Sequence, residues 1–255
     1  MMKLNLPGMR RINDRLWRYA YRFAGLRWHL SSGVFVEVAN PIEWIIYNDI
    51  FADGDYDVPL TELLERKTDR PLTVADLGAN VGFFSLRLAH LAAVRSFANQ
   101  VNVEGIEGCR ALCDVARQRW SACRFSEGRV AFCVTHGLIG KKSGTDEIFH
   151  QPLHGMNSTF RKNGRGELVS YVDLSAHFAN VERIDLLKCD IEGSEQRFFE
   201  TYPDVLTKTH AVVVEFHPEF CDPAICIGLL KDAGFTKHRV LSKDRQFSLE
   251  YLWKA

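Results

Sequence analysis

A glycine-rich turn constrains the fold more than any other stretch of this chain. Residues 73–86 read TVADLGANVGFFSL, in which a short apolar run ends near Asp76 and apolar residues at helical spacing follow Gly82. This order predicts a strand, a tight loop and the N-terminus of a helix. Gly78 and Gly82 lack a Cβ atom, so the backbone can turn sharply there and a ligand can come close. The free N–H groups of the first helical turn would then face that ligand.

Two classes of cofactor bind at turns of this kind. A dinucleotide site calls for G-x-G-x-x-G, with the pyrophosphate at the helix N-terminus. Here the pattern is D-x-G-x-N-x-G, and an asparagine occupies the position of the second fingerprint glycine. The pattern resembles motif I of the class I S-adenosylmethionine (SAM) methyltransferases, whose cofactor has no phosphate; a purely structural turn is the alternative. The resemblance implies these cofactor-binding residues: Asp76, Gly78, Ala79, Asn80, Gly82 and Phe83.

Composition places the chain among ordinary globular proteins. It has 255 residues, 46% of them hydrophobic and 25% charged, enough for one α/β domain or two small ones. The formal net charge is zero, so the molecule as a whole does not attract nucleic acid or membranes electrostatically. No apolar run reaches the roughly 18 residues of a membrane-spanning helix. Seven cysteines without a C-x-x-C pair indicate reduced thiols in a cytoplasmic protein.

The first 30 residues depart from this neutral average, since they carry seven basic residues against a single acid. Apolar residues are interleaved with the arginines, which predicts a basic amphipathic helix. Residues 10–27 could contact an anionic surface such as lipid, or the helix could pack on the domain with its arginines solvated. We expect residues 1–70 to form an N-terminal helical and strand appendage or lid, and residues 71–255 to form the methyltransferase domain.

Strand and helix patterns alternate regularly after residue 72, which predicts an α/β fold. The predicted strands span 73–77, 100–106, 129–134, 185–190 and 211–216, and the predicted helices span 82–95, 109–119, 194–200 and 223–233. Such alternation favours a mostly parallel sheet with helices on both faces, as in the class I methyltransferase (Rossmann-like) fold. A C-terminal hairpin, 237–242 and 247–253, should leave one antiparallel strand at the sheet edge. Extra strands at 141–151 and 167–172 flank a polar loop, 154–166.

Ligands of such sheets bind outside the carboxyl ends of the strands, where acids gather in this sequence. The second strand ends at Glu107, whose carboxylate could accept hydrogen bonds from a ribose diol; Glu104 is the competing choice but lies mid-strand. The fourth strand ends in a crowd of charges, KCDIEGSE, in which Lys188 and Asp190 share one face. An internal contact between these two residues, with a serine cap on the next helix, is the structural alternative.

The fifth predicted strand repeats the theme, because Glu215 and His217 follow each other on one face at its end. With this third piece the chain resembles the FkbM family of SAM-dependent methyltransferases. The matching pieces are residues 76–85, 187–195 and 214–217, in that order. The resemblance implies a class I methyltransferase fold, SAM as methyl donor, and usually O-methylation of a sugar, lipid, polyketide or related small molecule. The family commonly has an acid followed by proline at the second strand, whereas Gly108 follows Glu107 here.

The predicted chemistry centres on the charged ends of strands four and five. A sulfonium methyl group is already activated, so the protein must mainly hold the acceptor oxygen in line with it. A hydroxyl acceptor also loses its proton, and the candidate bases are His217 and Asp190, with Lys188 beside them. Alternatively, Asp190 and Glu215 could hold a Mg²⁺ ion that lowers the pKa of the hydroxyl.

Other functions are disfavoured by specific features of the chain. An NAD-dependent oxidoreductase would need the missing second glycine, and a non-catalytic SAM-binding protein would bind cofactor without turnover. Residues 10–27 could track the phosphates of a nucleic acid, but the rest of the chain offers no basic groove, and residues 40–43 (NPIE) lack the N-P-P-[YF] motif. The expected partner is a small-molecule, glycan or lipid acceptor. Its pocket should be shaped by the loop at 154–159 and the N-terminal helix.

Overall fold

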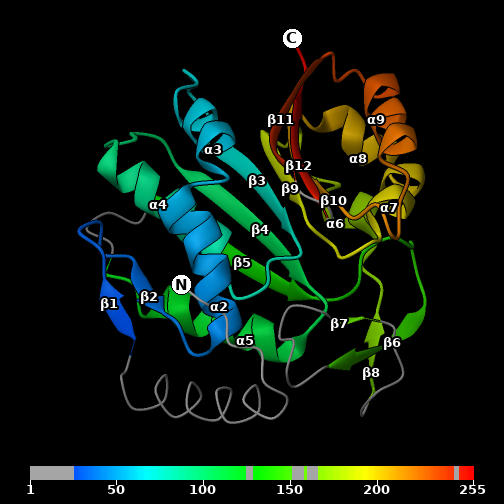
Figure 1. The fold of residues 1–255 in the computed structure, drawn as a ribbon. Coiled ribbons are helices and arrows are strands. Elements are labelled where there is room, and N and C mark those ends of the chain that lie inside the picture. Colours follow the sequence, from blue (N-terminus) through cyan, green and yellow to red (C-terminus); the bar gives the residue numbers. More distant parts are fainter. Residues whose placement is uncertain (1–25, 125–128, 151–157, 160–165, 244–246) are drawn as a thin grey trace, which may run out of the picture.

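The computed structural model describes residues 26–124, 129–150, 158–159, 166–243 and 247–255. A central sheet of seven strands runs through the molecule, with helices on both faces (Figure 1). Its strand order is β11-β12-β10-β9-β3-β4-β5. In chain order the strands are β3 (Leu72–Leu77), β4 (Val101–Glu107), β5 (Val130–His136), β9 (Leu186–Cys189), β10 (Ala211–Phe216), β11 (Lys237–Lys243) and β12 (Ser248–Trp253). All five predicted core strands are therefore present, displaced by no more than two residues at either end.

Strands β3, β4, β5, β9 and β10 are parallel, so their carboxyl ends meet at one edge of the sheet. The C-terminal hairpin differs from the expectation of an antiparallel strand at the edge. The reversed strand β12 lies inside the sheet, between β10 and β11, and the edge strand β11 runs parallel to β10. The reason is hydrophobic: residues 248–252 are all buried, whereas residues 237–240 are exposed and tolerate the edge position.

Successive side chains of each strand point to opposite faces of the sheet and pack into different hydrophobic clusters. Val74 and Val213 pack into a cluster with α3 (Asp57–Leu64) and α4 (Phe83–Val94) on one face. Ala75 and Val214 pack into a second cluster on the other face. The helices of this second face are α6 (Leu174–His177), α7 (Glu195–Thr201), α8 (Pro203–Lys208) and α9 (Pro223–Asp232). Helix α8 was not predicted from the sequence.

The segment before the sheet packs on the first face. Strands β1 (Arg27–His29) and β2 (Phe35–Glu37) form an antiparallel hairpin, so the helix predicted through residue 30 is wrong at residues 27–29. Its remaining residues, 1–25, lie outside the described part of the chain. Helix α2 (Pro41–Tyr47) follows and continues as a π-helical turn, η1 (Asn48–Asp53). Val34 and Val36 share the hydrophobic cluster of β3 and α4, so this segment contributes to the core of the sheet.

A buried ion pair fixes α2 against the sheet helices. Arg119 of α5 (Arg110–Ser121) is 1% exposed and donates a hydrogen bond to the carboxylate of Glu43 in α2. The guanidinium of Arg119 also lies over the ring of Phe83, 4.9 Å from its centroid. A buried charge of this kind needs both a paired acid and close packing, because desolvation opposes it. The contact joins three helices that are far apart in the sequence.

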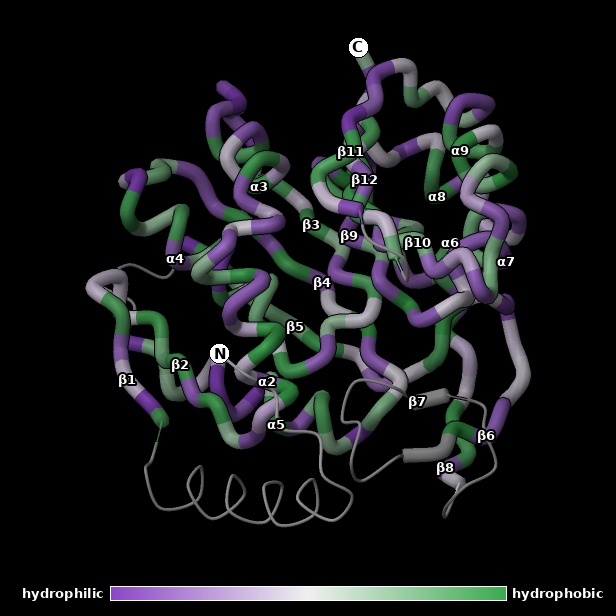
Figure 2. Tube along the Cα trace, in the orientation of Figure 1, coloured by the Kyte–Doolittle hydropathy of each residue, from purple (hydrophilic) through white to green (hydrophobic). Residues whose placement is uncertain are grey.

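A second, small sheet lies beside the carboxyl ends of the main strands (Figure 1). It consists of β6 (Thr145–His150), β7 (Ser158–Thr159) and β8 (Gly166–Ser170), in the order β7-β6-β8. Two of these strands were predicted, and most of the polar loop between them lies outside the described residues. On the opposite end of the molecule, the connection 65–70 before β3 is hydrophilic (Figure 2). No helix in the described residues has the length and apolar character needed to cross a membrane.

Candidate functional site

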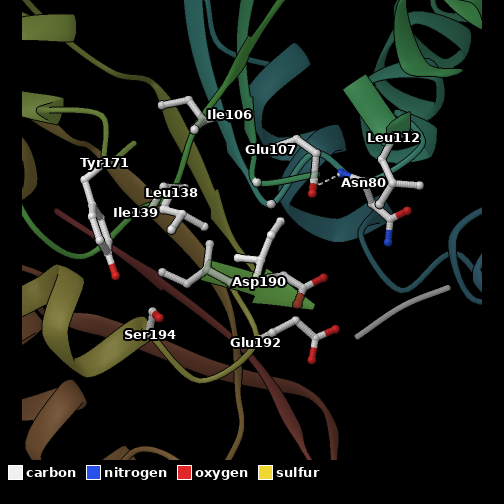
Figure 3. A pocket seen from close by; sticks show the side chains of 15 residues that line it. Asn80, Ile106, Glu107, Leu112, Leu138, Ile139, Tyr171, Asp190, Glu192 and Ser194 are labelled. Atoms are coloured by element: carbon white, nitrogen blue, oxygen red, sulfur yellow. Dashed lines mark hydrogen bonds between the residues drawn. The ribbon is translucent and has the colours of Figure 1, made fainter. Parts of the chain in front are cut away.

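A cleft opens at the carboxyl ends of β3, β4, β5 and β9 (Figure 3). It holds about 730 Å³ of free space, including the part open to solvent. The glycine loop after β3 contributes Gly78 and Asn80, and β4 contributes Glu107. Asp190, from the end of β9, lines the cleft next to this loop, and Tyr171 extends the wall toward the small sheet. The cleft therefore lies where the strand ends predicted it.

The glycine loop touches the end of β9 directly. Gly78 has a φ angle of +77°, and a Cβ atom on it would lie 1.8 Å from the carbonyl oxygen of Asp190. Only glycine fits this position, because both the left-handed backbone and the contact exclude a side chain. The Lys188 ammonium donates a hydrogen bond to the Gly78 carbonyl oxygen at 2.6 Å. Loop and strand end thus form one rigid wall of the cleft.

Glu107 lies on this wall with its carboxylate already partly bound. One carboxylate oxygen accepts the Asn80 backbone N–H at 2.8 Å, and the other accepts the Cys109 N–H at 2.8 Å (Figure 3). Burial raises the pKa of Glu107, and these two hydrogen bonds partly oppose that rise. Each oxygen keeps a lone pair for a ligand. Glu107, and not Glu104, lines the cleft.

The charges below the cleft floor are paired internally. Asp76 is fully buried and accepts a hydrogen bond from the Ser85 hydroxyl at 2.7 Å. The Lys188 ammonium lies 3.6 Å from Asp76 and 3.4 Å from Asp190, measured to the nearest carboxylate oxygens. Burial opposes the charge of Lys188, but the carboxylates of Asp190 and Asp76 outweigh it and raise its pKa. Lys188 therefore holds the two strand ends together. The predicted internal contact between Lys188 and Asp190 is present, but the Ser194 side chain does not cap α7.

Four residues predicted at the cofactor do not line the cleft, namely Asp76, Ala79, Gly82 and Phe83, and the Asp76 side chain is fully buried. Ala79 is buried against Cys113, and Gly82 starts α4 with a φ angle of +83°. The Phe83 side chain packs in the core against α2 and η1, with its ring centroid 6.0 Å from that of Phe51. A side-chain contact of Phe83 with a ligand is therefore not supported. Its orientation follows from its place as the first residue of α4, whose buried face is turned toward the N-terminal segment.

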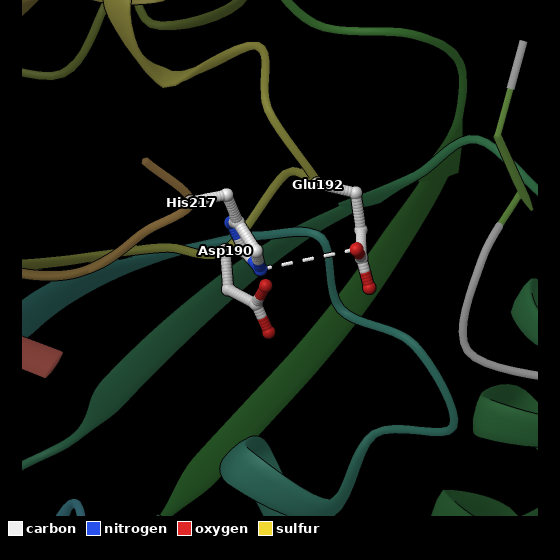
Figure 4. Close-up of side chains that lie close together, drawn as sticks. All are labelled: Asp190, Glu192 and His217. Atoms are coloured by element: carbon white, nitrogen blue, oxygen red, sulfur yellow. Dashed lines mark ion pairs between the residues drawn. The ribbon is translucent and has the colours of Figure 1, made fainter. Parts of the chain in front are cut away.

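A cluster of acids surrounds His217 at the ends of β9 and β10. The Nδ1 atom of His217 lies 3.1 Å from a Glu195 carboxylate oxygen. Its Nε2 atom lies 3.5 Å from Glu215 and 3.8 Å from Glu192 (Figure 4). Burial works against the charged form of His217, but the hydrogen bonds to Glu195 and Glu215 prevail and raise its pKa to about 11. His217 is therefore protonated at neutral pH.

The pKa values of two acids in this cluster are also raised, which favours their neutral forms. Burial and the neighbouring Asp190 raise the pKa of Glu192 to about 8, and the same two causes raise the pKa of Glu215. Asp190, Glu192 and His217 can each offer one ligand atom within 4.8 Å of the others (Figure 4). Glu215, predicted to share a metal with Asp190, is not one of these three. Asp190 and Glu192 also line the cleft, so the two sites adjoin.

Sequence reasoning missed several residues of the site. Glu192 and Glu195 were recognised only as part of the charged stretch after β9, although Glu192 has a left-handed φ angle of 52°. The glycine that follows Glu192 is the local signal for a turn at this point. Tyr56 comes from the N-terminal segment: burial and the carboxylates of Asp190, Glu215 and Asp76 raise its pKa. Nothing in the local sequence of Tyr56 indicates this position.

The strand order, with one reversed strand between the fifth and the last parallel strand, defines the class I methyltransferase fold. No protein-family model matches the sequence, and no curated protein matches it. Among solved structures, the chain is similar to magnesium protoporphyrin IX methyltransferase from Synechocystis with bound SAM (12% identity, all of both chains, TM-score 0.49).

Two further solved structures are similar to the chain at comparably low sequence identity. A TehB-like SAM-dependent methyltransferase from Corynebacterium glutamicum matches 83% of this chain and 96% of its own, at 11% identity and a TM-score of 0.42. The human methyltransferase 10 domain containing protein matches 99% of both chains, at 8% identity and a TM-score of 0.46. The class of the fold rests on the strand order of this chain itself.

Proposed function

We propose that this protein is a SAM-dependent methyltransferase that methylates a hydroxyl of a small molecule, sugar, lipid or natural-product intermediate. The observation that carries the proposal is the convergence of the Gly78 loop, Glu107 and Asp190 on one cleft. The resemblance of residues 76–85, 187–195 and 214–217 to the FkbM family supports the same function and supplies the preference for oxygen. The acidic cluster around His217 adjoins this cleft and gives the acceptor side its chemistry.

The lining of the cleft fits SAM. The Glu107 carboxylate has lone pairs left for the two hydroxyls of a ribose, and it is held in place by two backbone N–H groups. Leu112 and Leu138 provide apolar surface beside Glu107 for the adenine ring of SAM. Asp190 can accept hydrogen bonds from the amino-acid part. When bound, SAM supplies a methyl group on a sulfonium, which needs no further activation.

The residues of the chain would then orient the acceptor and take up its proton. Asp190 is the better candidate for the base, because His217 already carries a proton at neutral pH. The imidazolium of His217 can instead stabilise negative charge that develops on the acceptor oxygen. Lys188 acts through Asp190 and Asp76, whose carboxylates it holds in position. Positioning of this kind can supply several kcal/mol of the barrier.

Other candidate functions have less support. A Mg²⁺ ion between Asp190 and Glu215 is disfavoured, because Glu215 lies against the imidazole of His217. An NAD-dependent oxidoreductase would use the same cleft without the second fingerprint glycine. Nucleic-acid methylation, or contact with an anionic surface, would depend on residues 10–27, almost all of which lie outside the described part of the chain. A SAM-binding protein without turnover would share the cofactor site.

The proposal is tested by calorimetric titration of the purified protein with SAM and, in parallel, with NADH. Micromolar binding of SAM without binding of NADH is expected; the reverse would favour the oxidoreductase. A panel of hydroxylated acceptors with methyl-labelled SAM then tests for turnover. Asp190→Asn should bind SAM but lose most activity, since an amide is a poor base. Full activity of this variant would exclude Asp190 as the catalytic residue, and the matched control is Asp232→Asn at the exposed end of α9.

A further inference from the structure

We infer that Asp190, Glu192 and His217 form a binding site for one divalent transition-metal ion, such as Mn²⁺ or Zn²⁺. One ligand atom from each of the three residues lies within 4.8 Å of the other two (Figure 4). Ligand atoms about 2.1 Å from one ion lie roughly 3 to 4 Å apart, so small side-chain movements suffice to bind it. Binding of the ion stands by itself, and its role in catalysis rests on the proposed methyl transfer.

The orientation of His217 supports a metal ligand. Its Nδ1 atom donates to a carboxylate oxygen of Glu195, a residue that is fully buried. The same oxygen accepts the backbone N–H of Gly193 at 3.0 Å, which fixes it in position. This contact turns Nε2 toward Asp190 and Glu192. Histidines that bind metals are held in this way by a carboxylate on their other nitrogen.

The second carboxylate oxygen of Glu195 shows that the negative charge beside His217 is not fully compensated. It has no hydrogen-bond partner among the described residues, although it is buried. A buried carboxylate without a full set of partners is costly unless a nearby positive charge compensates it. Four acids, Asp190, Glu192, Glu195 and Glu215, gather around the imidazole of His217. A divalent cation bound between Asp190, Glu192 and His217 would take the place of the proton on Nε2 of the imidazole.

The donor set decides the class of metal. Two carboxylates and one imidazole suit first-row transition metals, whereas Mg²⁺ prefers oxygen ligands and retains most of its waters. The ion would lie at the acceptor side of the cleft, because Asp190 and Glu192 line both sites. There it would lower the pKa of a bound hydroxyl. The inferred site thus differs from the predicted pair Asp190 and Glu215 in both ligands and metal.

The inference is tested by titrating Mn²⁺ alone into the full chain. The electron paramagnetic resonance signal of the free ion reports how much Mn²⁺ is bound. One ion per chain with micromolar affinity is expected, with Mg²⁺ competing at least tenfold more weakly. His217→Ala and Glu192→Gln should each weaken binding by tenfold or more. His238→Ala, at an exposed histidine of the edge strand β11 that pairs with Glu250 of β12, should leave the affinity for Mn²⁺ unchanged. Wild-type affinity in Glu192→Gln, which keeps the size of the side chain, would overturn the assignment.

Parallel calorimetry with SAM separates this inference from the proposed function. Binding of SAM without any binding of Mn²⁺ or Zn²⁺ would overturn the metal site and leave the methyltransferase proposal standing. Binding of Mn²⁺ that depends on His217, without binding of SAM, would support the metal site and overturn the proposed function. Equal affinity for Mg²⁺ and Mn²⁺ would overturn the transition-metal assignment.

Discussion

The Nδ1 atom of His217 lies 3.1 Å from the Oε1 atom of Glu195, and this contact organises the acidic cluster beside the cleft. Glu195 begins α7 and is fully buried, whereas His217 follows β10 and is only partly exposed. The pair therefore joins the loop after β9 to the loop after β10. It fixes which imidazole nitrogen faces Asp190 and Glu192, and it keeps the ring protonated in the metal-free protein.

Glu195→Gln should lower the pKa of His217. Glutamine keeps the shape of the side chain and a hydrogen-bond acceptor but removes the charge that stabilises the imidazolium. The pKa of His217, followed by the NMR signal of its ring proton, should move from about 11 toward the ordinary value near 6.5. Glu200→Gln, at the exposed end of α7, is the matched control. An unchanged titration in Glu195→Gln would mean that Glu215 alone sets the charge of the ring.

Glu107→Ala should weaken SAM binding while the fold persists. Loss of a charged hydrogen-bonding group costs about 1.5 to 3 kcal/mol, or roughly 10- to 100-fold in Kd. Calorimetry measures the affinity, and circular dichroism checks the fold. Glu104→Ala, three residues earlier on β4, should bind SAM as the wild type does, because Glu104 faces His177 and not the cleft. Equal losses in both variants would indicate a general effect on the strand.

Gly78→Ala should destabilise the protein severely. The new Cβ atom would lie 1.8 Å from the Asp190 carbonyl oxygen on a backbone with positive φ, so loop and strand end must separate. We expect a loss of several kcal/mol, on the order of 3 or more, in the free energy of unfolding measured with urea. Gly228→Ala in α9 is the control, since nothing lies within 4 Å of its added Cβ. That variant should gain about 0.5 to 1 kcal/mol from higher helix propensity.

His210→Gln should make stability less dependent on acid pH. Burial and the nearby Arg66 and Arg183 lower the pKa of His210 to about 4, against about 6.5 in the unfolded chain. The neutral ring of His210 therefore contributes to the free energy of unfolding of the wild type. This contribution is complete above pH 6.5 and is lost as the pH falls toward 4, since the unfolded state binds the proton first. The ring is partly exposed, so the loss should be about 1 kcal/mol. Urea unfolding at pH 7 and pH 4.5 measures this loss of stability. An equal drop in the free energy of unfolding in variant and wild type would contradict the prediction.

The main sheet was predictable because its strands follow simple rules. Short apolar runs with an acid at or near their ends mark β3, β9 and β10, and parallel pairing brings these ends together. The location of the cleft follows from that geometry alone. The order of the last two strands does not, because it depends on which strand of the hairpin buries more surface against β10.

The details of the site depend on contacts between distant segments, which spacing cannot reveal. Phe83 begins a helix beside the glycine loop, and only the packing of α2 and η1 shows that its ring enters the core. Glu192 joins the acidic cluster because its backbone turns to positive φ, which a non-glycine residue seldom does. Tyr56 lies about twenty residues before the glycine loop and reaches the same acids through the fold.

The position of β12 between β10 and β11 has a consequence during synthesis. β10 carries Glu215 and leads into His217, and its free edge is a run of valines until residues 248–253 pair with it. A nascent chain that has emerged only as far as β11 therefore exposes a hydrophobic strand edge, a template for aggregation. Chaperone capture should be strongest at that length, and premature termination there should yield insoluble protein and no partly active fragment.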